Sequence, residues 1–414
     1  MARALSPWLG MFWPNVAKVL KGTVLAQAIP VLSSMLLTRL FLPAEFGAFS
    51  VWLGLAQLIA VFMTGRYETA IALEQDVSAR LTAVAATANV IGMTALLLAV
   101  AGGALAWSGK SASLHLTGSL AVLLAPTAAL IAIAQLWQNW AAAEQRFGDL
   151  TAIRIIQALG ISLAQVLAGL LFPTAVSLAL AYTLGVLTSI AYANYRLPLK
   201  GTASHARRDF RRRHYRLPLL SLPADTINSA AAQLPLLFIG ARFGPESAGL
   251  LALTLRTLGA PISILGVSVL DVFRGRAAAA YRDRGECRAE YIDTARGLLI
   301  ISAVATGVLA LTSRWLFVTA FGAPWAFCGT LTLWLLPMFF LRFIASPMSY
   351  TFYIANRQGF DLVWQVALLV TTVVTLSLPP TFLGAVIAWG AGYSALYVVY
   401  LVGSYRLSLG RAGR

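Results

Sequence analysis

The sequence LTAVAATANVIGMTALLLAVAGGALAW, residues 81–107, contains no charged side chain over 27 consecutive positions. At a rise of about 1.5 Å per residue, such a run forms a helix long enough to cross the roughly 30 Å of hydrocarbon in a bilayer. It lacks the alternation of polar and apolar residues that a strand of a membrane barrel requires. The stretch therefore predicts a transmembrane α-helix.

Similar apolar runs recur along all 414 residues of the chain. We place them near residues 19–38, 47–65, 83–107, 116–140, 151–171, 174–195, 217–240, 248–272, 295–313, 327–349, 361–378 and 381–404. Hydrophobic residues make up 59% of the chain and charged residues 11%, whereas soluble domains have about 25% charged residues. We expect an all-α polytopic membrane protein with about 12 transmembrane helices.

Basic residues gather in the N-terminal segment and in every second loop between the predicted helices. The densest blocks lie at 196–216 and 274–296. The positive-inside rule therefore places both termini in the cytoplasm, which agrees with an even number of helices. We expect a multi-pass protein of the bacterial inner (cytoplasmic) membrane.

The net charge of +16 would make nucleic acid a candidate partner of a soluble protein. Here the charge follows from the asymmetry between loops, so no nucleic-acid partner is expected. The block HARRDFRRRHYR, residues 205–216, leaves two interpretations open. It serves only to orient the chain in the membrane, or it also contacts an anionic headgroup or an acidic partner.

Two short patterns occur twice, once in each half of the chain. In the first, Arg39, Pro43, Glu45 and Gly47 match Arg242, Pro245, Glu246 and Gly249. In the second, Pro126, Gly148 and Asp149 match Pro337, Gly359 and Asp361, with a Pro-to-Gly spacing of 22 residues in both halves. We expect two six-helix bundles, 1–195 and 217–414, joined by a basic cytoplasmic linker at 196–216. Because six spans return the chain to the same side, the bundles should be parallel repeats with the substrate site at their interface.

Five stretches of the sequence carry a family resemblance. They are LTRLFLPAEFGAFS at 37–50, RYETAIAL at 66–73, QNWAAAEQRFGDLTAIRIIQALG at 138–160, AQLPLLFIGARFGPESAGLLALTLRTLGAPISILGVSVLDVF at 232–273 and FGAPWA at 321–326. In this order they resemble the Wzx-type polysaccharide and O-antigen flippases of the multidrug/oligosaccharidyl-lipid/polysaccharide (MOP) transporter superfamily. The resemblance runs from about residue 15 to 400, nearly the whole chain.

This resemblance implies a MATE-like MOP fold with two six-helix bundles around a V-shaped cavity. It implies a flippase that moves undecaprenyl-pyrophosphate-linked oligosaccharide from the cytoplasmic to the periplasmic leaflet by alternating access, for O-antigen, lipopolysaccharide or other surface polysaccharide biosynthesis. The expected partners are lipid-linked oligosaccharide, membrane lipids, and the polysaccharide polymerase and chain-length proteins. No cofactor is expected, and the resemblance suggests coupling to a proton or sodium gradient.

Charged side chains inside the predicted helices are candidates for a binding site. A charge in a span costs at least about 2.5–3.5 kcal/mol, so it usually faces a cavity or a partner. Asp225 and Arg256 fall at depths that differ by only about 6 Å if their helices stand upright. They form a structural pair, or Arg256 joins Arg342 in a cationic lining for pyrophosphate or an acidic sugar. In the second case Asp225 is a candidate for ion coupling.

Arg66 and Glu68 flank Tyr67 at the predicted cytoplasmic end of the second helix. They form an interfacial salt bridge beside a tyrosine of the aromatic belt, or they recognise an incoming headgroup. Arg154 lies about one turn inside its helix, where it snorkels to water or contacts substrate. The candidate substrate-binding residues are Arg256, Arg342, Arg66, Glu68 and Arg154.

An enzyme is not expected from this sequence. The chain has 3 histidines, all in or next to loops, and no HExxH, P-loop or GxSxG motif, so we predict no catalytic residue and no metal site. The alternatives to the flippase are an ion-coupled drug or cation antiporter, a lipid II flippase of the same superfamily, and an assembly scaffold that transports nothing.

Overall fold

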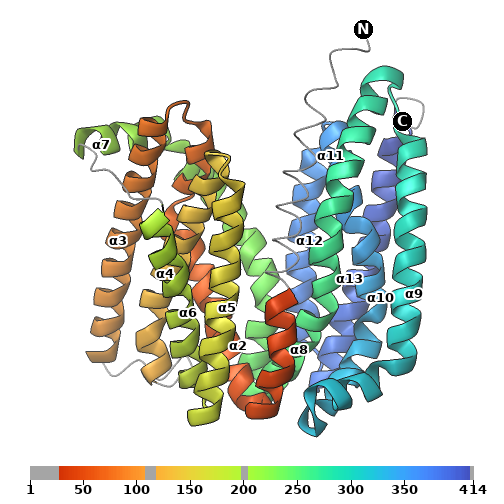
Figure 1. Ribbon diagram of the computed structural model, residues 1–414. Helices are drawn as coiled ribbons and strands as arrows, with labels where there is room; N and C mark the ends of the chain where they lie inside the picture. The colour runs from red at the N-terminus through yellow and green to blue at the C-terminus, as the bar shows by residue number, and fades with distance from the viewer. Residues whose placement is uncertain (1–27, 108–117, 197–203, 411–414) are drawn as a thin grey trace. The chain divides into compact units, whose positions relative to one another are not determined.

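The computed structural model describes residues 28–107, 118–196 and 204–410, and every secondary-structure element in these ranges is helical (Figure 1). The elements are a first helix at Ala28–Leu40, α2 (Pro43–Thr64), η1 (Tyr67–Leu73), α3 (Val77–Trp107), α4 (Gly118–Ala143), α5 (Phe147–Leu171), α6 (Ala175–Arg196), α7 (Ser204–Arg213), η3 (Leu217–Ser221), α8 (Leu222–Arg284), α9 (Arg288–Phe321), η4 (Ala323–Trp325), α10 (Ala326–Met348), α11 (Tyr350–Ile354), α12 (Gln358–Ser377) and α13 (Phe382–Ser408). The predicted all-α fold is confirmed. The start of the first predicted span, before residue 28, lies outside the described residues.

The helices that could cross a bilayer agree with the hydropathy of the sequence. Within the described ranges, 9 segments are long and apolar enough to span, and two shorter apolar helices lie at Ala28–Leu40 and Val363–Ser377. One of the 9 segments, Leu217–Ile262, is broken at Gly244 (φ 85°, ψ 173°), a conformation that essentially only glycine adopts. This break divides α8 into two helices, which correspond to the predicted spans near 217–240 and 248–272.

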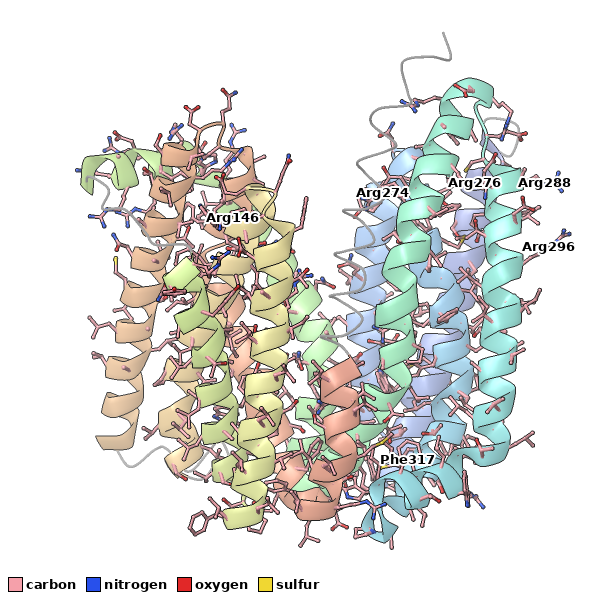
Figure 2. All side chains as sticks on the ribbon, in the orientation of Figure 1. Arg146, Arg274, Arg276, Arg288, Arg296 and Phe317 are labelled. Carbon is pink, nitrogen blue, oxygen red and sulfur yellow. The ribbon has the colours of Figure 1, made fainter. Side chains whose placement is uncertain are left out.

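The outer face of α9 shows where hydrocarbon would surround the protein. Exposed apolar side chains recur every three or four residues along it, at Ile300, Val304, Val308, Leu311 and Trp315. Arg288 and Arg296 lie towards one end of α9 and Phe317 towards the other (Figure 2). The rise from Arg296 to Trp315 is about 28 Å, which matches the hydrocarbon thickness of a bilayer.

The chain divides into two compact units, Met1–Gln233 and Leu234–Arg414, so the boundary falls inside α8. Helix α7, from the predicted linker at 196–216, and the start of α8 therefore belong to the first unit. The linker is not only a loop, because the ten residues of α7 form a helix that contacts α3 (Figure 1). The predicted domain limits at 195 and 217 stay a prediction.

In the first unit, α4 packs against α2, α3 and α6, and α5 packs closely on α6. A glycine allows the last contact, because a Cβ atom on Gly185 would overlap the backbone of Ile161. Trp52 of α2 is fully buried, and its indole Nε1 donates to the carbonyl of Leu120 on α4 at 2.8 Å. Small residues and satisfied polar groups allow such helices to pack where hydrocarbon is the solvent.

In the second unit, α10 packs against α9 and α13, and α12 packs on α13. Aromatic rings fill much of the contact between α12 and α13. The ring centre of Trp364 lies 4.4 Å from that of Tyr400 and 5.5 Å from that of Tyr397. Tyr393 adds a polar contact, because its hydroxyl lies 2.7 Å from the Thr372 hydroxyl.

In both units the proline of the first repeated pattern begins a helix, although the residue before it has a negative φ in one case and a positive φ in the other. Pro43 is the first residue of α2, directly after Leu42 in an extended conformation. Pro245 follows the break at Gly244 and begins the second segment of α8. Proline suits both places, because the first turn of a helix has no use for its missing N–H group.

The second repeated pattern also matches in the backbone. Gln145 and Asn356 both have positive φ angles, of 55° and 53°, and each is followed by an arginine in the N-cap position of a helix. Arg146 is the N-cap of α5, and Arg357 is the N-cap of α12. The two halves therefore share helix-start geometry as well as sequence.

Candidate functional site

A strained turn at the end of α2 sets the position of Arg66. Gly65 and Arg66 both adopt the left-handed conformation, with φ angles of 56° and 62°. This costs a residue other than glycine about 1–2 kcal/mol, so neighbouring contacts must hold it. The Arg66 N–H donates to Thr64 Oγ1 at 3.2 Å, and its carbonyl accepts from Thr69 Oγ1 at 2.7 Å. The turn ends α2 and begins η1.

Arg66 lies between two carboxylates, and we call Arg66, Glu68 and Asp225 the Arg66 cluster. Arg66 Nη1 donates to Glu68 Oε1 at 3.0 Å, and Arg66 Nε lies 2.7 Å from Asp225 Oδ2 near the start of α8. Glu68 is only 5% exposed, and its Oε2 atom has no hydrogen-bond partner among the described residues. One guanidinium thus faces two carboxylates, and one buried carboxylate oxygen is left without a donor, which is costly in a folded protein.

A second polar contact joins α8 to α2 itself. Gln233 Nε2 on α8 donates to Gln57 Oε1 on α2 at 2.8 Å. Gln57 precedes Arg66 by nine residues and Gln233 follows Asp225 by eight, so the two contacts lie about 12 Å apart along the helices. Polar side chains therefore connect α2 with the start of α8 at two levels.

The surroundings of Tyr67 correct one prediction. The salt bridge between Arg66 and Glu68 is confirmed, but Tyr67 is not a tyrosine of the membrane belt. It is 8% exposed, because Phe210 of α7 covers it with the two ring centres 5.9 Å apart. Burial raises the pKa of the Tyr67 phenol, and the positive charge of Arg211 on α7 offsets part of that rise.

Arg154 takes part in a network between α4 and α5. Its Nε donates to Gln138 Oε1 at 3.2 Å, and Gln138 Nε2 donates to Gln157 Oε1 at 3.0 Å. The Arg154 side chain therefore contacts α4. The sequence alone had left two interpretations open, snorkelling to water and contact with substrate. A guanidinium next to two amides suits hydroxyl, carboxylate or phosphate oxygens.

The two remaining candidate arginines lie in the second unit. Arg256, on the second segment of α8, is half-buried. Arg342, on α10, is exposed, and its guanidinium lies 5.8 Å from the centre of the Phe339 ring. Since the Asp225 carboxylate contacts Arg66 in the first unit, its pairing with Arg256 stays a prediction, as does a shared lining of Arg256 and Arg342.

Sequence reasoning missed Gln57, Gln138 and Phe210. Phe210 had a signal, because a single phenylalanine inside a run of arginines indicates an anchored face of a helix. The signals for Gln57 and Gln138 were weaker. Amide side chains inside apolar helices commonly form hydrogen bonds to a neighbouring helix, but the sequence does not show which helix that is. Among the described residues, no group of three or more His, Cys, Asp or Glu side chains could hold a metal ion.

A family model described as "Polysaccharide biosynthesis protein" matches residues 36–329. The match covers most of the sequence and includes the whole Arg66 cluster. The chain belongs to the polysaccharide biosynthesis protein family. The resemblance seen in the sequence is thereby confirmed at the level of the family.

Solved structures place this family member in the MATE-like MOP fold. "Lipid II flippase MurJ, inward closed conformation" has a TM-score of 0.73 at 13% identity, over 94% of this chain and 89% of that chain. An outward-facing multidrug resistance MATE family transporter of the MOP superfamily has a TM-score of 0.54 at 15% identity, over 95% of both chains. A MATE structure in complex with MaD5 has a TM-score of 0.57 at 12% identity, over 95% of this chain and 96% of that chain. No curated protein matches the chain.

Proposed function

We propose that the protein is a flippase that moves undecaprenyl-pyrophosphate-linked oligosaccharide from the cytoplasmic to the periplasmic leaflet of the bacterial inner membrane. Its product would supply the assembly of O-antigen or another surface polysaccharide. Membership of the polysaccharide biosynthesis protein family is the observation that carries this proposal. The fold shared with a lipid II flippase supports it.

In this proposal the Arg66 cluster receives the pyrophosphate. A guanidinium matches phosphate oxygens in a bidentate fork. Because Arg66 already faces two carboxylates, a pyrophosphate must displace one of them. Asp225 is 35% exposed and Glu68 5% exposed, so Asp225 is the one that leaves. Its departure would loosen the contact between α2 and α8, which links binding to helix movement.

The other candidate residues complete the proposed route. Arg154 would contact the glycan, and Arg256 and Arg342 would hold the pyrophosphate in the second unit. Asp225, once released from Arg66, is the proposed site for a coupling proton or sodium ion. The polysaccharide polymerase and chain-length proteins are the proposed partners that use the product.

Reconstitution with defined cargo tests the proposal. Proteoliposomes would contain an undecaprenyl-pyrophosphate oligosaccharide, lipid II, or a cationic drug, and exposure of each cargo in the opposite leaflet would be followed over time. We expect the pyrophosphate-linked oligosaccharide to cross at least tenfold faster than in protein-free vesicles, a change worth about 1.4 kcal/mol. Preferential transport of lipid II or of the drug would overturn the proposed cargo.

A further inference from the structure

The segment from the start of α7 to Asp225, residues 204–225, contacts the η1 turn at two places. Asp225 contacts Arg66 at one end of the turn. At the other place, the α7 helix lies against Tyr67 and the residues that follow η1. Residues 204–225, which are close together in sequence, therefore contact the turn at Arg66 from two directions.

Phe210 is the centre of the contact made by α7. It is 0% exposed, although five arginines lie on the same ten-residue helix. Its ring centre is 5.9 Å from that of Tyr67 and 4.8 Å from that of His214. A fully buried phenylalanine in so basic a helix shows that Phe210 is the apolar anchor of α7.

Polar contacts hold Glu74, which lies directly after η1. His214 Nε2 lies 3.0 Å from Glu74 Oε1, and Arg213 Nη2 lies 3.6 Å from the same oxygen. The Glu74 carbonyl accepts from Arg80 Nε of α3 at 2.9 Å. Glu74, the residue that follows η1, thus contacts both the end of α7 and α3.

We propose that Phe210 is a positioning residue for the Arg66 cluster. Tyr67 lies between Arg66 and Glu68, and the left-handed conformation at Arg66 persists only where tertiary contacts hold it. Phe210 supplies such a contact by fixing the Tyr67 ring, so the Arg66 guanidinium is held in place before the pyrophosphate arrives. Preorganisation of this kind acts on substrate affinity rather than on the movement of the helices.

This inference rests on the proposed function, so its test uses the same flipping assay with undecaprenyl-pyrophosphate oligosaccharide at several mole fractions. Phe210→Ala should raise the mole fraction for half-maximal rate about tenfold while the maximal rate changes less than twofold, because only binding geometry is lost. Phe210→Leu, which keeps an apolar side chain, should restore most of the affinity. Arg208→Gln, an exposed change on the same helix, is the control and should behave as the unaltered protein.

A double-mutant cycle separates positioning from general damage. If Phe210 acts through Arg66, adding Phe210→Ala to Arg66→Gln should change the half-maximal mole fraction less than twofold, because the guanidinium that Phe210 positions is already absent and coupled residues are not additive. Two results would overturn the inference and leave the proposed function intact. One is that the effects of the two substitutions are fully additive. The other is that Phe210→Ala leaves the affinity unchanged while Arg66→Gln weakens binding. Failure of the unaltered protein to flip this cargo would instead overturn the proposed function. Melting temperatures in detergent identify a variant that has lost its fold. If Phe210→Ala has lost it, Phe210→Leu carries the test through a smaller rise in the half-maximal mole fraction at an unchanged maximal rate, and no rise would overturn the inference.

Discussion

Helix α2 and the second segment of α8 begin alike and end differently. Both start at a repeated proline, Pro43 and Pro245. However, α2 ends at Thr64 and turns through two left-handed residues into η1, whereas the α8 segment continues as a helix to Arg284. The Arg66 cluster is built on that turn. The repeated prolines thus mark helix starts that both halves share. The turn after α2, which has no counterpart in the α8 segment, carries the proposed site.

The repeated corner itself shows how polar contacts diverge on a shared backbone. In the first unit, Glu45 Oε2 accepts from the backbone N–H of Ala175 at 2.5 Å and caps the start of α6. In the second, Arg242 Nη1 donates to the carbonyl of Leu376 at 2.6 Å, near the end of α12. A carboxylate suits a helix N-terminus and a guanidinium suits a C-terminus, because the helix dipole favours each charge at that end.

Loss of Arg66 should have the largest effect. Arg66→Gln removes the cation that contacts both Glu68 and Asp225. We expect flipping of the pyrophosphate-linked cargo to fall at least tenfold, equivalent to about 1.4 kcal/mol, and stability to fall by roughly 1–3 kcal/mol. Arg276→Gln, an exposed change on the second segment of α8, should alter flipping less than twofold. Equal losses in both variants would contradict the assigned difference between the halves.

Replacement of Gly244 should have an intermediate effect on stability. No atom lies within 4 Å of the position that a Cβ atom would occupy at Gly244, so the cost of Gly244→Ala comes from the backbone alone, at about 1–3 kcal/mol. Gly359 is equally open but has no positive φ, so Gly359→Ala should be neutral or stabilising by up to about 1 kcal/mol. Melting temperatures of the two variants in one detergent measure the contrast. A neutral Gly244→Ala would show that α8 is not broken there.

The smallest effect is expected at the repeated glutamates. Glu45→Ala removes the cap of α6 and should cost roughly 0.5–2 kcal/mol. Glu246→Ala, at the matching place on an exposed residue, should change stability by less than about 0.5 kcal/mol. Thermal unfolding of both variants tests this, and equal destabilisation would mean that the two corners still share their polar contacts.

Much of the fold could be predicted from the sequence, because the bilayer requires long apolar helices and the repeat marks where two of them begin. The Gly-Pro pair at Gly244 and Pro245 separated two spans that otherwise form one helical run. Helix α7 could not be predicted in the same way. Its ten residues are dominated by arginine, and only its contact with Tyr67 reveals which side is buried.

The candidate site was predicted in part. Arg66 and Glu68 are two residues apart, so their salt bridge follows from local geometry. The partner of Asp225 did not follow, because a depth estimated along an upright helix gives a height in the membrane but not the side on which a residue lies. The contact with Arg66 joins residues 159 positions apart, and only the packing of α8 beside α2 brings them together.

A lysine at position 66 tests most directly whether the Arg66 cluster binds substrate or is only a structural ion pair. Arg66→Lys keeps a cation between Glu68 and Asp225 but loses the planar fork that binds two phosphate oxygens at once. The flipping rate of undecaprenyl-pyrophosphate oligosaccharide would be measured alongside the melting temperature. If Arg66 binds the pyrophosphate, the Arg66→Lys protein should melt near the unaltered protein and flip at least tenfold more slowly, a loss of about 1.4 kcal/mol. Flipping at the rate of the unaltered protein would contradict that role.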